Sequence, residues 1–178
     1  LMMPAFHRQS LHNYLRTMEE ITCQNLKRWE DLGTFQWADE NKHLTFEIAS
    51  KLLIGTDAGT DSARLSRLFT QMTKGFVTVP LRWSWTPYGK ALQARDQLLA
   101  YIEKAVIHRQ KHPMNDVLGL LVQTRDDEGN QLTMEELKAQ TLLLLFAGHE
   151  TSASMITSLV MLLAQHPGVL EKARREQA

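Results

Sequence analysis

The sequence predicts a mainly α fold in which one long central helix, at about 134–165, is crossed by shorter helices. Apolar residues recur at three- and four-residue intervals along most of the 178 residues, which is the period of an amphipathic helix. Only Thr34–Ala38 alternates as a short strand does. With 43% apolar and 22% charged residues, the composition is that of an ordinary globular protein, and the length favours one domain.

Five shorter helices are predicted ahead of the central helix, and helix-breaking residues delimit most of them. Gly33, Gly55 and Gly75 end the first three, as glycine commonly does at a helix C-terminus. The fourth covers about 90–111 and the fifth about 116–123. The apolar residues that give the first helix its stripe are Leu11, Leu15, Met18, Ile21, Leu26 and Trp29.

The connection between the third and fourth helices, residues 76–88, is long, apolar and rich in aromatic residues. It contains Pro80 and Pro87 as well as Trp83 and Trp85. Loops of this length are usually functional lids or disordered linkers, and so many aromatic residues argue against plain disorder. The pattern therefore favours a lid.

The central helix has the clearest start signal in the chain. Thr133 and Glu136 form the pattern of a capping box, and no proline follows until Pro167. The helix is therefore expected to span about 32 residues, or ~48 Å. Its middle, residues 142–148, is apolar all round and is followed by a polar stretch at 149–152.

Three interpretations of this helix compete. A transmembrane span would place His149 and Glu150 near the bilayer centre, where a charged side chain costs ~2.5–3.5 kcal/mol. A plain core helix, buried on every side, explains the leucines but not Gly148, which costs about 1 kcal/mol relative to alanine. A functional break explains both, because Gly148 admits a close approach to the backbone and Thr151 can bond back to the Ala147 carbonyl. A carboxylate beside a hydroxyl in a buried helix suits proton delivery.

Residues 147–151, Ala-Gly-His-Glu-Thr, resemble the central-helix motif of cytochrome P450. Their context strengthens the resemblance, because a capped helix leads into them and Gln165–Pro167 follows as the family's passage into the next helix. Upstream, Pro4–Phe6 and Leu44–Ala49 are similar to the family's helices in that region. The 76–88 connection is similar to the substrate-lid loop of the branch that contains retinoid and sterol hydroxylases and their cyanobacterial relatives.

The resemblance implies a haem-thiolate monooxygenase that activates O2 on haem b and hydroxylates a lipophilic substrate. Ala147 and Gly148 would then be cofactor-binding residues that line the O2 pocket. Thr151 and Glu150 would be catalytic, Thr151 by placing water and donating a hydrogen bond, and Glu150 by connecting that hydroxyl to solvent. The implied partners are a lipophilic small molecule and a redox partner, either ferredoxin with its reductase or a diflavin reductase.

The resemblance also suggests residues that contact the substrate. Leu143 and Phe146 precede the motif by one turn and are expected on the same face, while Val79 and Leu81 belong to the lid.

The resemblance covers nearly all of the chain but only about two-fifths of a typical family member. Residues 1–178 are therefore expected to form a single partial domain, without the N-terminal part and without the C-terminal haem-ligand region. The family's iron ligand is a cysteine in a Phe-x-x-Gly-x-Arg-x-Cys-x-Gly loop, and no cysteine follows Cys23. Cys23 itself is predicted to be a small core residue. No metal ligand is expected in this chain, and the segment alone is expected to be inactive.

Charge and aromatic residues bear on the other partners. Twenty basic and twenty acidic side chains give a net charge of zero, which argues against nucleic acid. Trp83 and Trp85 would either pack on neighbouring helices or make a peripheral contact with a lipid surface. The expected location is accordingly cytoplasmic or peripherally membrane-associated.

Other readings of the sequence are a non-catalytic all-α binding or interaction module and two metal sites. The pair His149-Glu150 begins like the zinc motif H-E-x-x-H, but Ala153 stands where the second histidine is required. His108 and His112 stand four residues apart and either share a metal or belong to a solvated polar face, of which the face is favoured.

Overall fold

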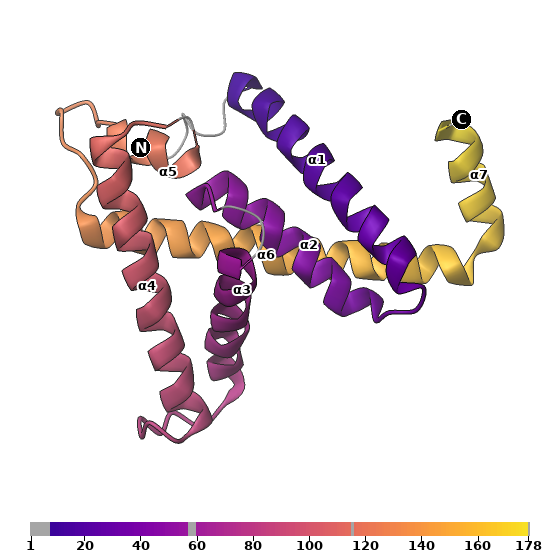
Figure 1. Cartoon of the computed structure of the whole chain (residues 1–178), viewed down its shortest axis with the longest axis horizontal. Coiled ribbons are helices and arrows are strands. Elements are labelled where there is room, and N and C mark those ends of the chain that lie inside the picture. Colours follow the sequence, from indigo (N-terminus) through magenta and orange to yellow (C-terminus); the bar gives the residue numbers. More distant parts are fainter. Residues whose placement is uncertain (1–7, 57–59, 115, 178) are drawn as a thin grey trace.

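The computed structural model describes residues 8–56, 60–114 and 116–177, and over these ranges the chain forms seven α-helices (Figure 1). This confirms the predicted mainly α fold with its long central helix. The helices are α1 (Arg8–Leu32), α2 (Trp37–Ile54), α3 (Thr60–Thr73), α4 (Pro87–Lys111), α5 (Val117–Gln123), α6 (Met134–Gln165) and α7 (Pro167–Gln177), and a short 3₁₀ helix, η2 (Lys74–Val77), follows α3.

The central helix α6 runs the length of the molecule, and the other helices are arranged along it (Figure 1). Helix α2 packs against α6, and α1 packs against α2. Helices α3 and α4 lie side by side and lead away from α6, so that their connection is at the end farthest from it. Helix α7 is bent by 111° from α6.

The main core lies where α2, α3, α4, α5 and α6 meet. Its largest fully buried apolar side chains are Phe46, Phe69, Leu98, Ile102, Val106, Leu118, Leu121 and Leu145. Of the leucine run in α6, only Leu145 is buried, whereas Leu143 is 58% exposed. The described residues therefore leave one side of this helix uncovered.

The predicted capping box starts α6. The backbone N–H of Thr133 donates to Glu136 Oε2 at 2.8 Å, and the backbone N–H of Glu136 donates to Thr133 Oγ1 at 3.3 Å. These bonds satisfy two of the N–H groups that a helix N-terminus leaves free. Backbone and side-chain hydrogen bonds from Thr133 also hold the pKa of Glu136 below its ordinary value.

The short strand predicted at Thr34–Ala38 is wrong. Gln36 is the N-cap of α2 and Trp37 is already helical, and no strand occurs within the described ranges. The alternation arises because Phe35 and Trp37 both pack on Trp29, with ring centroids 5.7 and 5.0 Å from it. The aromatic residues thus close a helix–helix turn.

The stripe predicted for the first helix is only partly correct, because α1 packs on α2 along one narrow side. Leu15 and Leu26 are exposed. Cys23 is also exposed, so the prediction that it is a core residue is wrong. It lies two residues from both Ile21 and Asn25, which face α2, and two residues turn the helix by about 200°. The resemblance at Pro4–Phe6 and the side chain of Leu11 fall outside the described residues.

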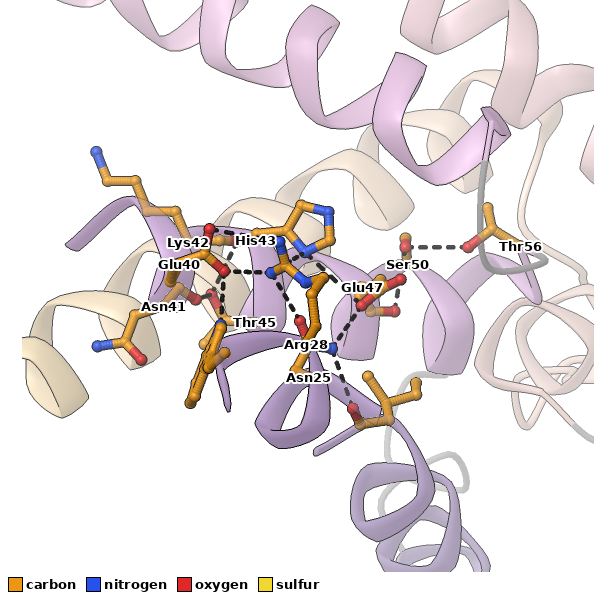
Figure 2. Close-up of polar contacts among 12 residues, drawn as sticks. Asn25, Arg28, Glu40, Asn41, Lys42, His43, Thr45, Glu47, Ser50 and Thr56 are labelled. Atoms are coloured by element: carbon orange, nitrogen blue, oxygen red, sulfur yellow. Dashed lines mark hydrogen bonds and ion pairs between the residues drawn. The ribbon is translucent and has the colours of Figure 1, made fainter. Parts of the chain in front are cut away.

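A polar network fixes α1 on α2 (Figure 2). Arg28 and Glu40 form an ion pair, and Glu40 also accepts a hydrogen bond from Trp29 Nε1 at 2.6 Å. Asn25 Nδ2 donates to Glu47 Oε2 at 2.8 Å. Because these bonds join residues one turn apart on α1 to residues two turns apart on α2, they set how α1 lies along α2.

A buried ion pair joins the ends of three helices. Arg109, at the end of α4, bonds to Asp116 Oδ2 through Nη2 at 2.5 Å and through Nε at 3.0 Å. Its Nη2 also donates to the carbonyl of Ile54, the last residue of α2, at 2.5 Å. Asp116 in turn caps α5 by accepting from the backbone of Gly119 at 2.7 Å. We call this group the Arg109 latch.

Candidate functional site

The side-chain bond predicted within α6 is present, but it does not break the helix. Thr151 Oγ1 donates to the Ala147 carbonyl at 2.5 Å, one turn earlier, while α6 continues as a helix. That carbonyl is also the acceptor that the helical bonding pattern assigns to the Thr151 backbone. The side chain therefore competes for it and loosens the helix at this turn.

One side of α6 at this turn is open and largely apolar. Leu143, Ala147, Thr151 and Met155 recur every four residues, and all four are exposed. At Gly148 an added Cβ would meet no atom within 4 Å. Ala147 and Gly148 also line a groove of about 590 Å³ whose other walls come from α1, α2 and α5. A flat or apolar group therefore has room to approach the backbone here.

Glu150 lies at the edge of this open side. Its side chain is partly exposed, and its Oε1 is 3.8 Å from Nε2 of His149. Adjacent residues on a helix point about 100° apart, so Glu150 and Thr151 face different directions from one turn. The carboxylate thus reaches solvent while the hydroxyl faces the open side.

His149, beside the site but turned toward α2, makes a buried polar contact that the sequence analysis did not predict. Its ring is only 3% exposed, its Nδ1 lies 2.9 Å from Thr45 Oγ1 in α2, and it meets Phe46 and Phe69 edge to face at 5.4 and 5.2 Å. Burial, and next the charge of Lys42, lower its pKa from 6.5 to about 4. A buried row at four-residue spacing, of Leu137, Thr141, Leu145, His149 and Ala153, is the signal that points to it.

The lowered pKa of His149 predicts acid-sensitive stability. Between pH 6.5 and about 4 the unfolded chain binds a proton at this ring and the folded chain does not. The ring therefore does not lower the free energy of unfolding above pH 6.5, and it lowers that free energy by up to about 3 kcal/mol as the pH drops to 4. In urea unfolding at pH 7 and pH 4.5, His149→Leu is expected to show a smaller difference in unfolding free energy than the parent. His108→Leu, which removes an exposed ring, should show the same difference between the two pH values as the parent. If His149→Leu and His108→Leu showed equal differences, His149 would not be the source of the acid sensitivity.

The four proposed substrate contacts lie in two places. Leu143 is on the open side of α6. Phe146 is partly buried and instead packs against Phe69 and Phe76, with ring centroids at 6.2 and 5.6 Å. Phe146 thus joins α6 to the start of the 76–88 connection, while Leu143, three residues earlier, stays exposed. Val79 and Leu81 follow in that connection with exposed side chains.

The connection folds into a defined turn. Thr86 Oγ1 lies 2.5 Å from the Leu81 carbonyl and 2.7 Å from the Trp83 carbonyl, and it accepts from the backbone of Gly89 at 3.0 Å as the N-cap of α4. Trp83 and Trp85 stack at 5.5 Å with their planes 16° apart. Both are exposed, Trp85 by 70%. The turn thus presents a pair of indoles at its tip.

Gly89 permits the close return of this turn, and Gly89→Ala is expected to disrupt it. An added Cβ would lie 1.9 Å from the Trp83 carbonyl oxygen, which is a backbone atom. The turn or the first turn of α4 must move, at a cost of about 1–3 kcal/mol. Limited proteolysis between residues 78 and 86 should therefore accelerate. Gly168→Ala, where an added Cβ meets nothing within 4 Å, is the matched control, and equal cleavage of the two variants would contradict the steric reason.

The described residues do not form a metal site of their own. No group of three or more histidine, cysteine or acidic side chains lies close enough to hold an ion there. His108 and His112 are both exposed, with ring centroids 5.0 Å apart. In the same ranges, no single helix is long and apolar enough to cross a membrane, and only α6 and α7 together, bent at their junction, pass such a test.

Comparison with known proteins gives the same family along the whole chain. The cytochrome P450 family model matches residues 1–178. A putative cytochrome P450 120 from Synechocystis sp. is 36% identical over 179 residues, which cover 99% of this chain and 40% of that protein. Cytochrome P450 26B1 from Homo sapiens is 33% identical over 180 residues, which cover 96% of this chain and 35% of that protein.

A solved structure agrees with these relatives. Retinoic acid-bound cyanobacterial CYP120A1 matches with a TM-score of 0.86 and 36% sequence identity, over 98% of this chain and 40% of that one. Both matches cover nearly all of this chain, but the chain spans only about two-fifths of the length of either relative. Sequence and fold lead to one conclusion: this chain belongs to the cytochrome P450 family.

Proposed function

We propose that the protein containing this chain is a haem-thiolate monooxygenase that uses O2 to hydroxylate a lipophilic substrate. Residues 1–178 would form the central part of its catalytic domain, and a redox partner, either ferredoxin with its reductase or a diflavin reductase, would supply the electrons. Family membership supports this function over a non-catalytic helical module. The observation that carries it is the bond from Thr151 to the Ala147 carbonyl on the open side of α6.

The residues on the open side fit one face of a haem, which we take to be haem b. Ala147 is small and exposed, and the space around Gly148 is empty, so a flat macrocycle can approach the helix. The haem would supply the reduction of O2 and the transfer of one oxygen atom to the substrate. Cys23, the only cysteine of the chain, is on α1 and away from this side, so we assign the thiolate ligand to residues outside 1–178.

Thr151 and Glu150 would manage protons at this face. A hydroxyl carries one hydrogen, and Thr151 donates it to Ala147, which leaves its lone pairs to accept from a water on the open side. When that water donates to the Ala147 carbonyl in place of Thr151, the Thr151 hydroxyl can donate its hydrogen bond to a group on the open side instead. Glu150, at the solvent edge, would exchange protons with bulk water and pass them to this chain of hydrogen bonds.

We further propose an elongated apolar substrate of retinoid type. The support is the similarity to a structure that holds retinoic acid and the apolar character of the residues assigned to contact. Leu143 would contact the substrate from the open side of α6. Phe146, Val79 and Leu81 would contact it from the junction with the lid.

The experiment is a spectroscopic one on the complete protein that contains this chain. The reduced protein with CO should give the spectrum of a thiolate-ligated haem, and retinoic acid should shift the spectrum of the oxidised protein as it displaces water. A CO spectrum of an imidazole-ligated or free haem would refute the haem-thiolate assignment. A thiolate spectrum without any response to retinoic acid would refute only the substrate class.

We also propose that the stacked Trp83 and Trp85 touch a lipid surface, because they are exposed, apolar and part of the connection between α3 and α4, two helices that lead away from α6 (Figure 1). The double variant Trp83→Ser/Trp85→Ser is expected to weaken sedimentation with phosphatidylcholine vesicles by more than about tenfold, since each side chain loses its apolar burial. Leu15→Ser, at an exposed leucine of α1, is the control and should bind as the parent does. Failure of the parent to sediment, or an equal loss in the control, would refute the contact.

A further inference from the structure

Two hydrogen bonds, one buried and one partly buried, join α2 to α6 on either side of the Thr151 position. Thr45 Oγ1 lies 2.9 Å from His149 Nδ1, and Asn41 Nδ2 donates to Thr157 Oγ1 at 3.1 Å. Asn41 and Thr45 stand one turn apart on α2 (Figure 2). Buried polar contacts of this kind specify how two helices lie against each other, because a rotated helix would leave the groups unpaired.

The bonds around Thr45 determine which nitrogen of His149 carries the proton. Thr45 Oγ1 is 2.8 Å from the Asn41 carbonyl, which can only accept. Thr45 therefore donates its single hydroxyl hydrogen to the Asn41 carbonyl, and Thr45 Oγ1 accepts a hydrogen bond from the His149 ring. His149 accordingly holds its proton on Nδ1 and leaves the lone pair on Nε2.

His149 and Thr151 lie on opposite sides of α6. Two residues turn a helix by about 200°, so the side of the helix that faces α2 through His149 is turned away from the open side that carries Thr151. A rotation of this turn by a few tens of degrees would break the bond to Thr45 and move the Thr151 hydroxyl by the same angle. The position of the hydroxyl is thus linked to the bond on the far side.

We propose that His149 is a positioning residue for Thr151, holding the Ala147–Thr151 turn in rotation through the bond from its Nδ1–H to Thr45. The inference rests on the proposed monooxygenase function, in which Thr151 delivers protons. His149 acts through the helix and does not touch the reacting atoms.

A role of His149 as a proton carrier does not fit its surroundings. The ring is packed between Phe46 and Phe69 and stays neutral at neutral pH, because burial lowers its pKa. Its Nε2 lone pair and Glu150 Oε1, 3.8 Å apart, do not form a hydrogen bond at that distance. Proton transfer is therefore left to Glu150, and the histidine serves as a fixed, uncharged anchor.

The first test measures the tautomer and needs no turnover. In the complete protein, labelled with ¹⁵N-histidine and held in the reduced CO-bound form, the His149 ring should show a protonated Nδ1 and an unprotonated Nε2. Thr45→Val, which removes the acceptor and keeps the shape, should abolish this preference, whereas Thr45→Ser should keep it. A parent ring protonated on Nε2 overturns the proposal.

The second test measures how much of the consumed O2 is released as hydrogen peroxide and how much reaches product. His149→Leu removes the donor, and the released share should rise about fivefold, the equivalent of one neutral hydrogen bond. His149→Asn, whose amide nitrogen stands where Nδ1 stood, should restore most of the coupling. His108→Leu, at an exposed ring of α4, is the control and should couple as the parent does.

The outcomes separate this inference from the function on which it rests. Equal uncoupling by His149→Leu and His149→Asn means that the ring only fills space, and unchanged coupling in both means that Thr151 is held by other contacts; either overturns the positioning role. A parent protein that lacks the thiolate CO spectrum overturns the proposed function instead, and the tautomer measurement then still reports on the Thr45 bond.

Discussion

Thr151→Ala in the complete protein is expected to reduce the product formed per O2 consumed by about tenfold, the upper range for one lost hydrogen bond. The hydroxyl that bonds to the Ala147 carbonyl is the only polar side-chain group among the four residues of the exposed row at 143, 147, 151 and 155. Without it, water on this side has no fixed donor, and O2 that is consumed leaves as hydrogen peroxide. The measurement is the ratio of product and peroxide to O2 consumed at saturating substrate.

Two variants make this result specific. Thr151→Ser keeps the hydroxyl and should retain most of the coupling. Ser154→Ala removes another exposed hydroxyl of α6 close by and should behave as the parent. Since Thr151 is exposed, the fold should survive all three changes, and the thiolate CO spectrum checks this. Unchanged coupling in Thr151→Ala would show that proton delivery follows another route.

Arg109→Met is expected to be strongly destabilising, at about 3–5 kcal/mol of unfolding free energy. Arg109 is 7% exposed, and its loss leaves the Asp116 carboxylate and the Ile54 carbonyl without this partner in a buried place. The ends of α2, α4 and α5 would lose their common attachment. Urea unfolding of the complete protein at pH 7, followed by far-ultraviolet circular dichroism, measures the effect.

The control for the Arg109 latch separates burial from charge. Arg95 and Asp96 form an ion pair with about half or more of each side chain exposed, so Arg95→Met should cost less than about 1 kcal/mol. Asp116→Asn added to Arg109→Met should recover part of the loss, because it removes the unpaired charge and keeps an oxygen to cap α5. A double variant as unstable as the sum of its single changes would contradict a direct interaction between the two residues.

The helices were predictable because the chain carries strong local punctuation. Glycine at 33 and 55 adopts positive φ, 66° and 69°, where it ends α1 and α2, and the capping box at Thr133 starts α6 as expected. The strand at 34–38 failed because alternation of aromatic residues is the same pattern whether they line a sheet or a helix–helix turn. The prediction that Cys23 is buried was wrong because contacts between residues remote in sequence decide which side of α1 packs on α2.

In the candidate site, too, contacts between residues close in sequence were predictable and contacts between distant residues were not. The bond from Thr151 to Ala147 joins residues four apart, so the motif and helical geometry predicted it. The partner of His149 is Thr45, 104 residues away, and no local pattern identifies a bond over that separation. The contacts of Phe146 with Phe69 of α3 and Phe76 of η2 are likewise distant in sequence, and no local pattern identifies them.

The two tryptophan pairs described above give the chain two separable fluorescence signals. All four tryptophans of the chain occur as neighbours in space, Trp29 with Trp37 at 5.0 Å in the α1–α2 turn and Trp83 with Trp85 in the connection between α3 and α4. The first pair sits in a packed cluster, so its emission reports whether the helices are assembled. The second pair is open to aqueous quenchers and senses what covers the tip. The chain thus carries two separate fluorescent reporters, one in the α1–α2 turn and one in the connection between α3 and α4.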